Sequence, residues 1–343
     1  MNLEELNQTA RQLVAPGKGI LAADESTGTM TKRLDSVGVE STEENRRAYR
    51  NILFTTEGLG EFISGVILFD ETIRQKTDDG TPFPEHLAGA GVIPGIKVDA
   101  GAKPLAAFPG EKVTEGLDGL RDRLTEYREL GARFAKWRAV IGIDRQQGLP
   151  SDFCLEANAH ALARYAALCQ EADIVPIVEP EVLMDGDHGI EVCEEVTGRT
   201  LHYVFDALFR QRVMMEGILL KPNMVISGKK AANRAEPSEV AERTLRCLGD
   251  HVPASVPGIV FLSGGQTPQE ATRHLNLMNE IGGAPWELSF SYGRALQEPA
   301  LKTWAGNSDK ADAARAAFYE RARYNSAARH AQWSEAMEAS QAA

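Results

Sequence analysis

The sequence predicts an α/β protein folded as a single closed (β/α)8 barrel, the TIM-barrel architecture. Eight short apolar runs alternate with stretches of helical period, and polar residues gather where the runs end. From Asp24 to Ser291, the seven steps between run ends average about 38 residues, and a strand with its crossover helix needs about 30 or more. An open doubly wound sheet is the alternative, but it favours a glycine-rich dinucleotide turn after the first strand, where Ala23–Ser26 stand instead.

The eight apolar runs are the predicted strands. In chain order they are Gly19–Asp24, Ile63–Phe69, Val92–Val98, Phe134–Ile141, Ile174–Glu181, Ile218–Lys221, Ile259–Ser263 and Leu288–Ser291. Two apolar stripes with a period of 3.6 residues predict helices between them. The first stripe is Leu117, Leu120, Leu124, Tyr127 and Leu130, and the second is Leu201, Val204, Phe205, Leu208 and Met215.

Capping signals mark where two further helices begin. Thr267 and Glu270 form a capping box with proline at the first helical position, and Gly282 ends that helix. Ser41 and Glu44 predict a second capping box before a helix over Arg46–Leu59. No linker rich in proline and glycine divides the chain. We therefore expect one domain over residues 1–343, with a short N-terminal helix and an alanine-rich tail from about residue 326.

Composition and charge exclude several classes of protein. The 37 basic and 49 acidic residues give a net charge of −12, which disfavours non-specific binding to nucleic acid or to an anionic membrane. No apolar run approaches the roughly 18 residues of a membrane span, and Glu4 and Glu5 stand where a signal peptide would be basic. Four cysteines form no CxxC pair, so reduced thiols in a cytoplasmic protein are expected.

Charged and small polar residues stand at the ends of the predicted strands, where a barrel carries its chemistry. They are Asp24, Lys97, Lys136, Arg138, Glu179, Glu181, Lys221, Ser263–Gly265 and Ser291–Arg294. Pairs two residues apart share one face of a strand. With Lys32 and Arg33 included, this mouth is expected to carry +4 and the remainder of the molecule −16, which favours a small substrate with more than one phosphate.

Seven sequence blocks, in order along nearly the whole chain, resemble class I fructose-1,6-bisphosphate aldolases. They are Leu21–Gly28, Gly95–Asp99, Phe134–Arg138, Pro176–Glu181, Leu219–Met224, Phe261–Gln266 and Ser289–Arg294. The resemblance implies a lyase that reversibly cleaves fructose 1,6-bisphosphate into dihydroxyacetone phosphate and glyceraldehyde 3-phosphate in glycolysis and gluconeogenesis. It implies an imine between a lysine and the ketose carbonyl and no metal or other cofactor.

The resemblance assigns Lys221 as the Schiff-base lysine, whose amine must be neutral to attack a carbonyl. Burial and a neighbouring cation both favour a neutral amine, and Lys136 is expected to supply that cation. Glu179 matches the family's general acid and base, and its strand also brings in Glu181. Asp24 matches the carboxylate that interacts with the reacting hydroxyl of the substrate.

The loops after the seventh and eighth strands are the usual phosphate site of this fold. There, Ser263, Gly264, Gly265, Gly293 and Arg294 offer a hydroxyl, unhindered backbone N–H groups and a guanidinium. The resemblance adds Ser291 and Arg33 to the bisphosphate contacts. The second phosphate is expected across the mouth, toward Ser26 and Lys97, and Arg138 is a further expected substrate contact.

Other features are expected to lie outside the chemistry. Asp185, Asp187 and His188 are interpreted as surface turn residues, and the histidines show no zinc spacing. Eukaryotic members of the family end in a tyrosine that assists proton exchange, whereas this sequence ends Ser340–Ala343 and its nearest tyrosine is Tyr324. The resemblance implies a homo-oligomer, commonly a tetramer. A Schiff-base aldolase that prefers sedoheptulose 1,7-bisphosphate or fructose 1-phosphate, and a non-catalytic barrel scaffold, remain as alternatives.

Overall fold

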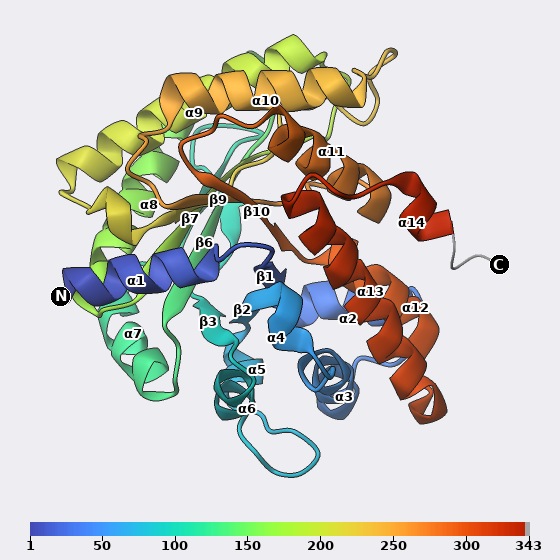
Figure 1. The fold of residues 1–343 in the computed structure, drawn as a ribbon. Helices are drawn as coiled ribbons and strands as arrows, with labels where there is room; N and C mark the ends of the chain where they lie inside the picture. Colours follow the sequence, from blue (N-terminus) through green and yellow to red (C-terminus); the bar gives the residue numbers. More distant parts are fainter. Residues whose placement is uncertain (340–343) are drawn as a thin grey trace.

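Eight parallel strands close into a barrel in the order β1–β10–β9–β8–β7–β6–β3–β2. The computed structural model describes residues 1–339, and Figure 1 shows the helices surrounding the strands. The strands are β1 Gly19–Ala22, β2 Ile63–Leu68, β3 Ile93–Lys97, β6 Phe134–Ile141, β7 Val175–Val182, β8 Leu219–Leu220, β9 Gly258–Phe261 and β10 Glu287–Tyr292. The predicted (β/α)8 barrel is confirmed, and the predicted strand ends shift by only a few residues.

The helices pack outside the barrel or across its lower end. They are α1 Leu3–Leu13, α2 Thr27–Asp35, α3 Glu43–Phe54, α4 Leu59–Phe62, α5 Asp70–Ile73, α6 Phe83–Gly89, α7 Leu120–Glu129, α8 Asp152–Glu171, α9 Ile190–Arg210, α10 Pro237–His251, α11 Pro268–Ile281, α12 Arg294–Trp304, α13 Ala311–Arg329 and α14 Glu335–Ala339. Two 3-10 turns, η1 Met215–Gly217 and η2 Ser308–Lys310, complete the connections. No helix within residues 1–339 combines the length and apolarity that a membrane crossing requires.

The lower half of the barrel interior is apolar. Alternate residues of the strands meet there and pack against α1 from below; they include Ile20, Ala22, Ile67, Phe134, Val175, Ile177, Leu219 and Val260. Leu6, Ala10 and Leu13 of α1 are fully buried against them. Because side chains alternate along a strand, the next inward positions on the same strands carry Lys136, Glu179 and Lys221. The apolar layer is therefore the floor beneath a charged layer.

The structure corrects the predicted start and end of α3. This helix covers Glu43–Phe54 rather than Arg46–Leu59. Its N-cap is Thr42, whose side chain accepts the N–H of Asn45, so the predicted capping box at Ser41 is wrong. The Ser41 hydroxyl instead accepts a hydrogen bond from Thr31.

Two other local expectations are also corrected, and one is confirmed. Met215 lies in η1 rather than in α9. The alanine-rich segment from residue 326 is still part of α13 up to Arg329. The capping box at Thr267 is confirmed in full.

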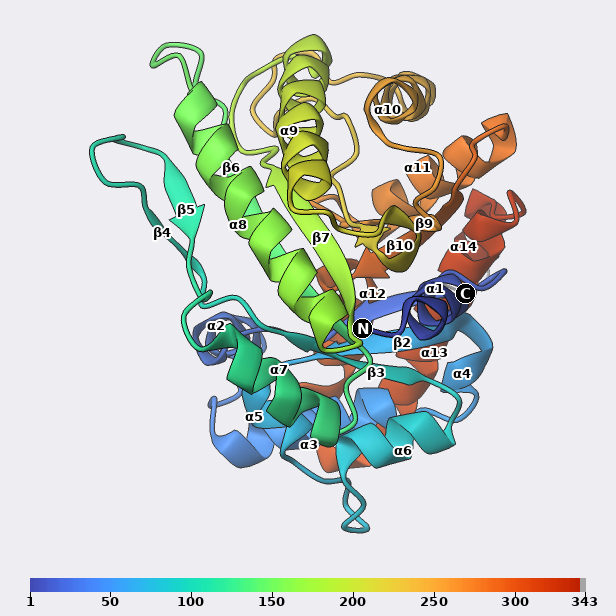
Figure 2. The same cartoon turned by 90° about the vertical axis from the view of Figure 1, so that its left-hand side faces the viewer.

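One antiparallel hairpin between β3 and α7 was not predicted. Its strands, β4 Ala102–Pro104 and β5 Lys112–Thr114, stand apart from the barrel in Figure 2. Each strand has three residues, too few for a period to be visible in the sequence. The hairpin matters for the site because Thr114 bonds the Arg138 carbonyl, which ties it to the end of β6.

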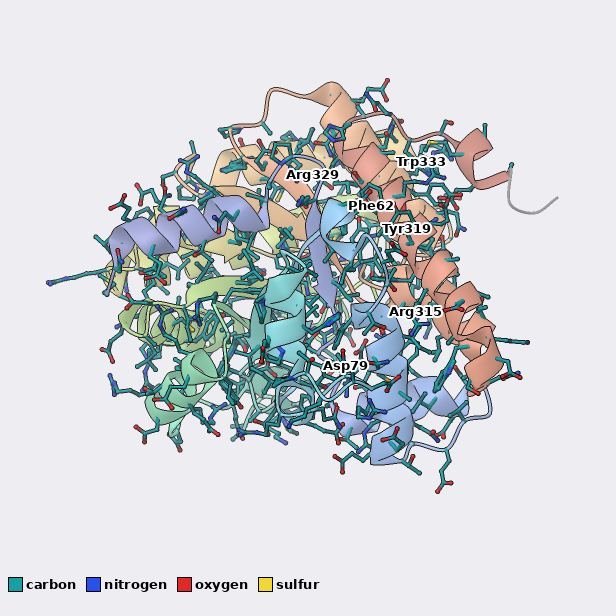
Figure 3. All side chains as sticks on the ribbon, turned by 60° about the horizontal axis from the view of Figure 1, so that its bottom comes forward. Phe62, Asp79, Arg315, Tyr319, Arg329 and Trp333 are labelled. Atoms are coloured by element: carbon teal, nitrogen blue, oxygen red, sulfur yellow. The ribbon has the colours of Figure 1, made fainter. Side chains whose placement is uncertain are left out.

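Arg329 joins the last long helix to the bottom of the barrel. Its side chain is 3% exposed and donates to the backbone carbonyls of Leu288, Val14, Ala15 and Lys18, while it also pairs with Glu287. Figure 3 shows it on α13 with Arg315, an arginine of the same helix. One guanidinium thus links β10 to the connection between α1 and β1, where the Ala15 carbonyl also accepts the Lys18 N–H and the Lys18 carbonyl also accepts the Ser289 hydroxyl.

We predict that Arg329→Met lowers the free energy of unfolding by about 3 kcal/mol, because the contacts of one buried guanidinium with four backbone carbonyls and with Glu287 are lost at once. Urea unfolding followed by circular dichroism measures this change. Arg315→Met is the matched control, since Arg315 is more exposed and pairs with Asp312 at the surface; it should cost less than about 1 kcal/mol. Equal losses in the two variants would contradict a special role for Arg329.

Candidate active site

A cavity of about 850 Å³ opens at the C-terminal ends of the barrel strands. All fifteen residues predicted for the site line it: Asp24, Ser26, Arg33, Lys97, Lys136, Arg138, Glu179, Glu181, Lys221, Ser263, Gly264, Gly265, Ser291, Gly293 and Arg294. They come from the ends of seven strands, from the loops that follow, and from the helices α2 and α12. The volume suits a small molecule of sugar bisphosphate size.

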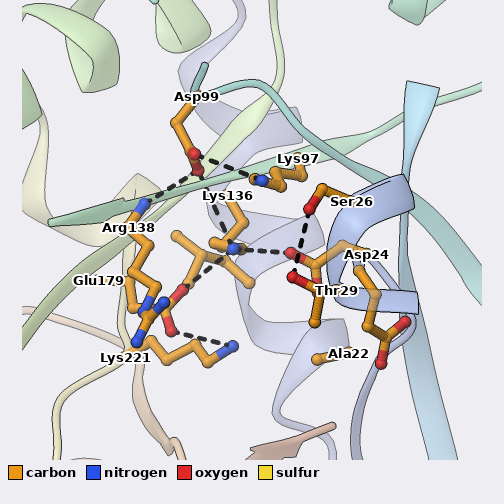
Figure 4. A network of polar contacts seen from close by, with 12 residues as sticks. Ala22, Asp24, Ser26, Thr29, Lys97, Asp99, Lys136, Arg138, Glu179 and Lys221 are labelled. Carbon is orange, nitrogen blue, oxygen red and sulfur yellow. Dashed lines mark hydrogen bonds and ion pairs between the residues drawn. The ribbon is translucent and has the colours of Figure 1, made fainter. Parts of the chain in front are cut away.

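Lys136 lies at the centre of a buried ion network (Figure 4). Its Nζ is 2.7 Å from Asp24 Oδ2, 3.4 Å from Glu179 Oε2 and 4.0 Å from Asp99 Oδ2. These carboxylates come from the ends of β1, β7 and β3, so one lysine of β6 joins four parts of the barrel. The Lys136 side chain is 5% exposed, which leaves the carboxylates as its main source of stabilisation.

The network sets the protonation states of Asp24 and Lys136. Burial acts to raise the pKa of Asp24, but the charges of Lys136 and Lys221 outweigh it and hold that pKa well below its ordinary value. Burial likewise acts to lower the pKa of Lys136, but Asp24, Glu179 and Asp99 outweigh it, so that pKa lies above its ordinary value. At neutral pH, Asp24 is therefore a carboxylate and Lys136 an ammonium.

Lys221 is the second lysine of the network. It follows β8 directly, and its backbone N–H donates to the Val178 carbonyl, which fixes the side chain on the inner face. Its Nζ lies 3.4 Å from Glu179 Oε1, and both side chains are 4% exposed. Glu179 thus lies between the two lysines, with one carboxylate oxygen toward each. The sequence predicted Lys136 as a cation beside Lys221. In the structure this cation also contacts three carboxylates, and the strand positions alone did not predict those contacts.

Three further ion pairs occupy the rim of the cavity. Arg33 pairs with Glu25, Arg138 pairs with Glu181, and the Nζ of Lys97 lies 3.6 Å from Asp99. Glu25 is itself held by Gln297, whose Nε2 donates to it at 2.8 Å. These cations are in part structural, because each already has a carboxylate partner before any substrate enters.

The loops after β9 and β10 have free donors. Gly264 and Gly265 adopt positive φ of 56° and 87°, and their N–H groups have no acceptor among residues 1–339. The Ser291 hydroxyl is buried and unpartnered within the same part of the chain. Gly293 is the N-cap of α12, so the positive end of that helix faces the cavity rim. Arg294 is exposed and pairs with no carboxylate of residues 1–339. This arrangement is suited to an anion.

The charge of the cavity differs from the expectation. The lining holds eight basic and seven acidic side chains, for a net charge of +1 rather than the predicted +4. Four acidic residues were missed, namely Glu25, Asp99, Asp185 and Glu298, together with the basic Lys229. The signal for Asp99 was present, because it stands two residues beyond Lys97, directly after the predicted run Val92–Val98. The others lie in loops or on α12, where no strand period points to them.

Two interpretations of single residues are tested by the geometry. Asp185 and Asp187 are exposed as expected, but His188 is 4% exposed, so its interpretation as a surface residue is wrong. Burial lowers the pKa of His188.

Tyr324 is buried, its hydroxyl donates to the Met337 carbonyl, and it does not line the cavity. Within residues 1–339, no group of three His, Cys, Asp or Glu side chains is arranged for a metal ion.

Fold and site together define the class of the protein as an enzyme built on a (β/α)8 barrel, with its chemistry at the C-terminal mouth. The family model of class I fructose-bisphosphate aldolase matches residues 5–343. The probable fructose-bisphosphate aldolase class 1 of Xanthomonas campestris is 61% identical over 337 residues, which cover 97% of this chain and 99% of that protein.

More distant relatives agree with this assignment. The cytosolic fructose-bisphosphate aldolase 6 of Arabidopsis thaliana is 55% identical over 326 residues, covering 95% of this chain and 90% of its own. A crystal structure of Plasmodium falciparum fructose-bisphosphate aldolase, in complex with TRAP and a small-molecule inhibitor, matches with a TM-score of 0.95 and 50% identity over 96% of this chain and 95% of that one. The chain belongs to the class I fructose-bisphosphate aldolase family and is a lyase. The resemblance stated from the sequence blocks is confirmed.

We predict that Lys136→Met lowers the free energy of unfolding by about 3 kcal/mol at pH 7, because it leaves buried carboxylates unpaired. Without that cation, the pKa of Asp24 in the folded protein should rise above its unfolded value. The folded variant then binds more protons than the unfolded chain, so the loss should shrink as the pH falls toward 5.

Urea unfolding of wild type and variant at pH 7 and pH 5 measures both effects. The double variant Lys136→Met/Asp24→Asn is the control, since it removes the unpaired carboxylate and should recover part of the stability at pH 7. A loss of the same size at both pH values would contradict the proposed origin.

Proposed function

We propose that Lys221 forms a Schiff base with the C2 carbonyl of fructose 1,6-bisphosphate and that the surrounding network moves the protons of the reaction. The observation that supports this most directly is the buried contact between the Lys221 amine and Glu179. This contact lies in the charged layer at the base of the cavity, and donors suited to an anion stand at the cavity rim. A lysine in this position is close enough to a carboxylate to exchange a proton with it.

The proposed sequence of steps assigns a role to each carboxylate. Glu179 takes a proton from the Lys221 ammonium, and the neutral amine then attacks C2. Glu179 returns this proton to the carbinolamine hydroxyl, which leaves as water. The iminium then withdraws electrons from the C3–C4 bond. Asp24, ionised by Lys136, accepts the proton of the C4 hydroxyl as that bond breaks and glyceraldehyde 3-phosphate is released. Protonation of the enamine at C3 and hydrolysis of the imine release dihydroxyacetone phosphate.

Charge balance favours this use of the network. The ammonium of Lys221 and the iminium that replaces it both carry one positive charge. The carboxylate that pairs with the first therefore stabilises the second at nearly the same place, with little rearrangement. Lys136 keeps its own charge throughout and holds Asp24 and Glu179 within reach of the reacting atoms. Glu181 is proposed to act through Arg138, which it pairs with at the rim.

The anion site is proposed to hold one phosphate through Ser263, Gly264, Gly265, Ser291, Gly293 and Arg294, with Arg33 nearby. Arg33 NH2 lies 3.6 Å from where a Cβ on Gly293 would stand, so it borders the same site. The second phosphate is proposed to lie across the mouth, near Ser26, Lys97 and Arg138. Two widely spaced dianions would explain why the cavity is lined by cations on opposite sides.

We further propose a metal-independent reaction and a cytoplasmic homo-oligomer, with a tetramer as the form that the family resemblance implies. The four cysteines are buried free thiols, which is in keeping with a reducing compartment. Sedimentation of the purified protein tests the oligomeric state.

Borohydride added with dihydroxyacetone phosphate should inactivate the enzyme and attach the ketose carbon skeleton to Lys221. Reduction turns the imine into a stable amine, so peptide mapping by mass spectrometry locates the label. Labelling of Lys97 or Lys136 in place of Lys221, or the absence of any label, would overturn the assignment. The same preparations should keep full activity in EDTA, and a loss that added metal restores would contradict the Schiff-base mechanism.

Arg294→Ala should weaken the binding of fructose 1,6-bisphosphate by about 1.5–3 kcal/mol, which corresponds to a KM roughly 10- to 100-fold higher. The reason is the loss of a charge-assisted contact to phosphate. Steady-state kinetics on fructose 1,6-bisphosphate and on unphosphorylated fructose measure the effect, and the poor activity on fructose should change little.

Arg210→Ala is the control for this substitution, because Arg210 is an exposed arginine outside the cavity lining whose one ion-pair partner among residues 1–339 is Asp206. Its kinetics should equal those of the wild type. Equal losses on fructose and on the bisphosphate in Arg294→Ala would show that Arg294 does something other than bind phosphate.

A further inference from the structure

The segment after β8 brings an additional lysine to the anion site. Backbone N–H groups of Gly228, Lys229 and Lys230 donate to the carbonyls of His188, Met184 and Gly186, at 2.8 to 2.9 Å. These three bonds fix the segment against the loop that follows β7. The close approach also requires a glycine at 228, since a Cβ there would stand 2.5 Å from the Gly186 carbonyl oxygen. The backbone position of Lys229 is thereby determined by the fold.

From this position the Lys229 side chain reaches over the phosphate loop. Its Nζ lies 2.7 Å from the place where a Cβ on Gly265 would stand, so the ammonium occupies room that the glycine leaves open. Lys229 lines the cavity together with Ser263, Gly264 and Gly265. The neighbouring Lys230 is also exposed but does not line the cavity. Of these two adjacent lysines, only Lys229 is placed to meet an anion at the loop.

Lys229 forms only a weak, exposed ion pair with Asp185. Its Nζ lies 3.1 Å from Asp185 Oδ1, and the two side chains are 45% and 68% exposed. Exposed ion pairs of this kind contribute little stability. Lys136 and Lys221, by contrast, pair with carboxylates that are almost fully buried.

Each phosphate monoester carries close to two negative charges at neutral pH, whereas the cavity lining has a net charge of only +1. A bisphosphate therefore needs cations that can leave their carboxylates.

We propose that Lys229 is a phosphate-binding residue of this enzyme, whose ammonium exchanges Asp185 for the phosphate held by the Ser263–Gly265 loop and Arg294. The proposal rests on the function proposed above for that loop. In the empty site, Asp185 keeps Lys229 over Gly265. When the phosphate arrives, the ammonium contacts its oxygens, and the exposed Asp185 returns to water.

Lys229→Met should raise the KM for fructose 1,6-bisphosphate and the inhibition constant of inorganic phosphate by the same factor, about five- to tenfold, with kcat changed less than twofold. Lys230→Met is the matched control, and both of its constants should equal those of the wild type. The assays use full-length protein at constant ionic strength, and circular dichroism confirms that each variant is folded.

Two more variants separate the charge from the shape of the side chain. Lys229→Arg keeps the cation and should retain most of the affinity for phosphate, whereas Asp185→Asn releases Lys229 and should lower both constants or leave them unchanged. Unchanged constants in Lys229→Met, equal effects in Lys230→Met, or a fall in kcat alone would each overturn the proposal. Wild-type activity and trapping at Lys221 test the proposed function separately, so its failure would be recognised independently of the variants.

Discussion

The contacts of Lys136 with three buried carboxylates are the constraint on which the rest of the site depends. A buried charge is costly unless it is paired, so Asp24, Asp99 and Glu179 have to meet this ammonium from three other strand ends. Their meeting fixes the relative height of β1, β3, β6 and β7 at the mouth. Glu179 also contacts the Lys221 amine, so one carboxylate lies between the two lysines. The network is balanced as a whole, with the lysines 97, 136 and 221 facing the three carboxylates.

The apolar floor makes this network possible. Inward-facing residues of the lower barrel, with α1 beneath them, exclude water from below. The side chains on the floor belong to the same strand faces as the charged ones, since Phe134 precedes Lys136 and Leu219 precedes Lys221 by two residues. β6, β7 and β8 therefore change from apolar to charged at one level of the barrel. In this dry surrounding, electrostatic interactions with the reacting atoms are stronger than they would be in water.

The cations beside the loops after β9 and β10 are paired differently from those of the interior. Inside, nearly every charge has a buried partner, and the pairing holds side chains in place. At the rim, Arg294 has no carboxylate partner within residues 1–339, and Lys229 has an exposed one. The proposed phosphate site would therefore use these cations without separating a buried pair. Because the lining is nearly neutral, the proposed binding of a bisphosphate would depend on a few well-placed donors at the loops after β9 and β10, rather than on a large positive field.

The sequence by itself determined the barrel and the charged residues that gather at its strand ends. Period-two alternation and strand spacing are local properties, so the pattern of residues alone assigned Lys136, Glu179 and Lys221 to one interior. The sequence blocks further indicated the family, which supplied roles that alternation alone could not. Local capping chemistry was determined equally well at Thr267, where both reciprocal hydrogen bonds form. At Ser41 it was not, because the neighbouring Thr42 competes for the same role and only the backbone geometry decides between them.

Only the tertiary structure decided which charges pair, and so what the cavity carries. Glu25, Asp185 and Lys229 reach the mouth through loops and backbone contacts between segments distant in sequence, and no periodicity points to them. The same holds for Arg329, whose acceptors belong to the two ends of the chain brought together by barrel closure. Pairing depends on distances of a few ångströms, and those distances exist only after the strands have closed. The sequence specifies the faces of the elements, whereas electrostatic balance is a property of their packing.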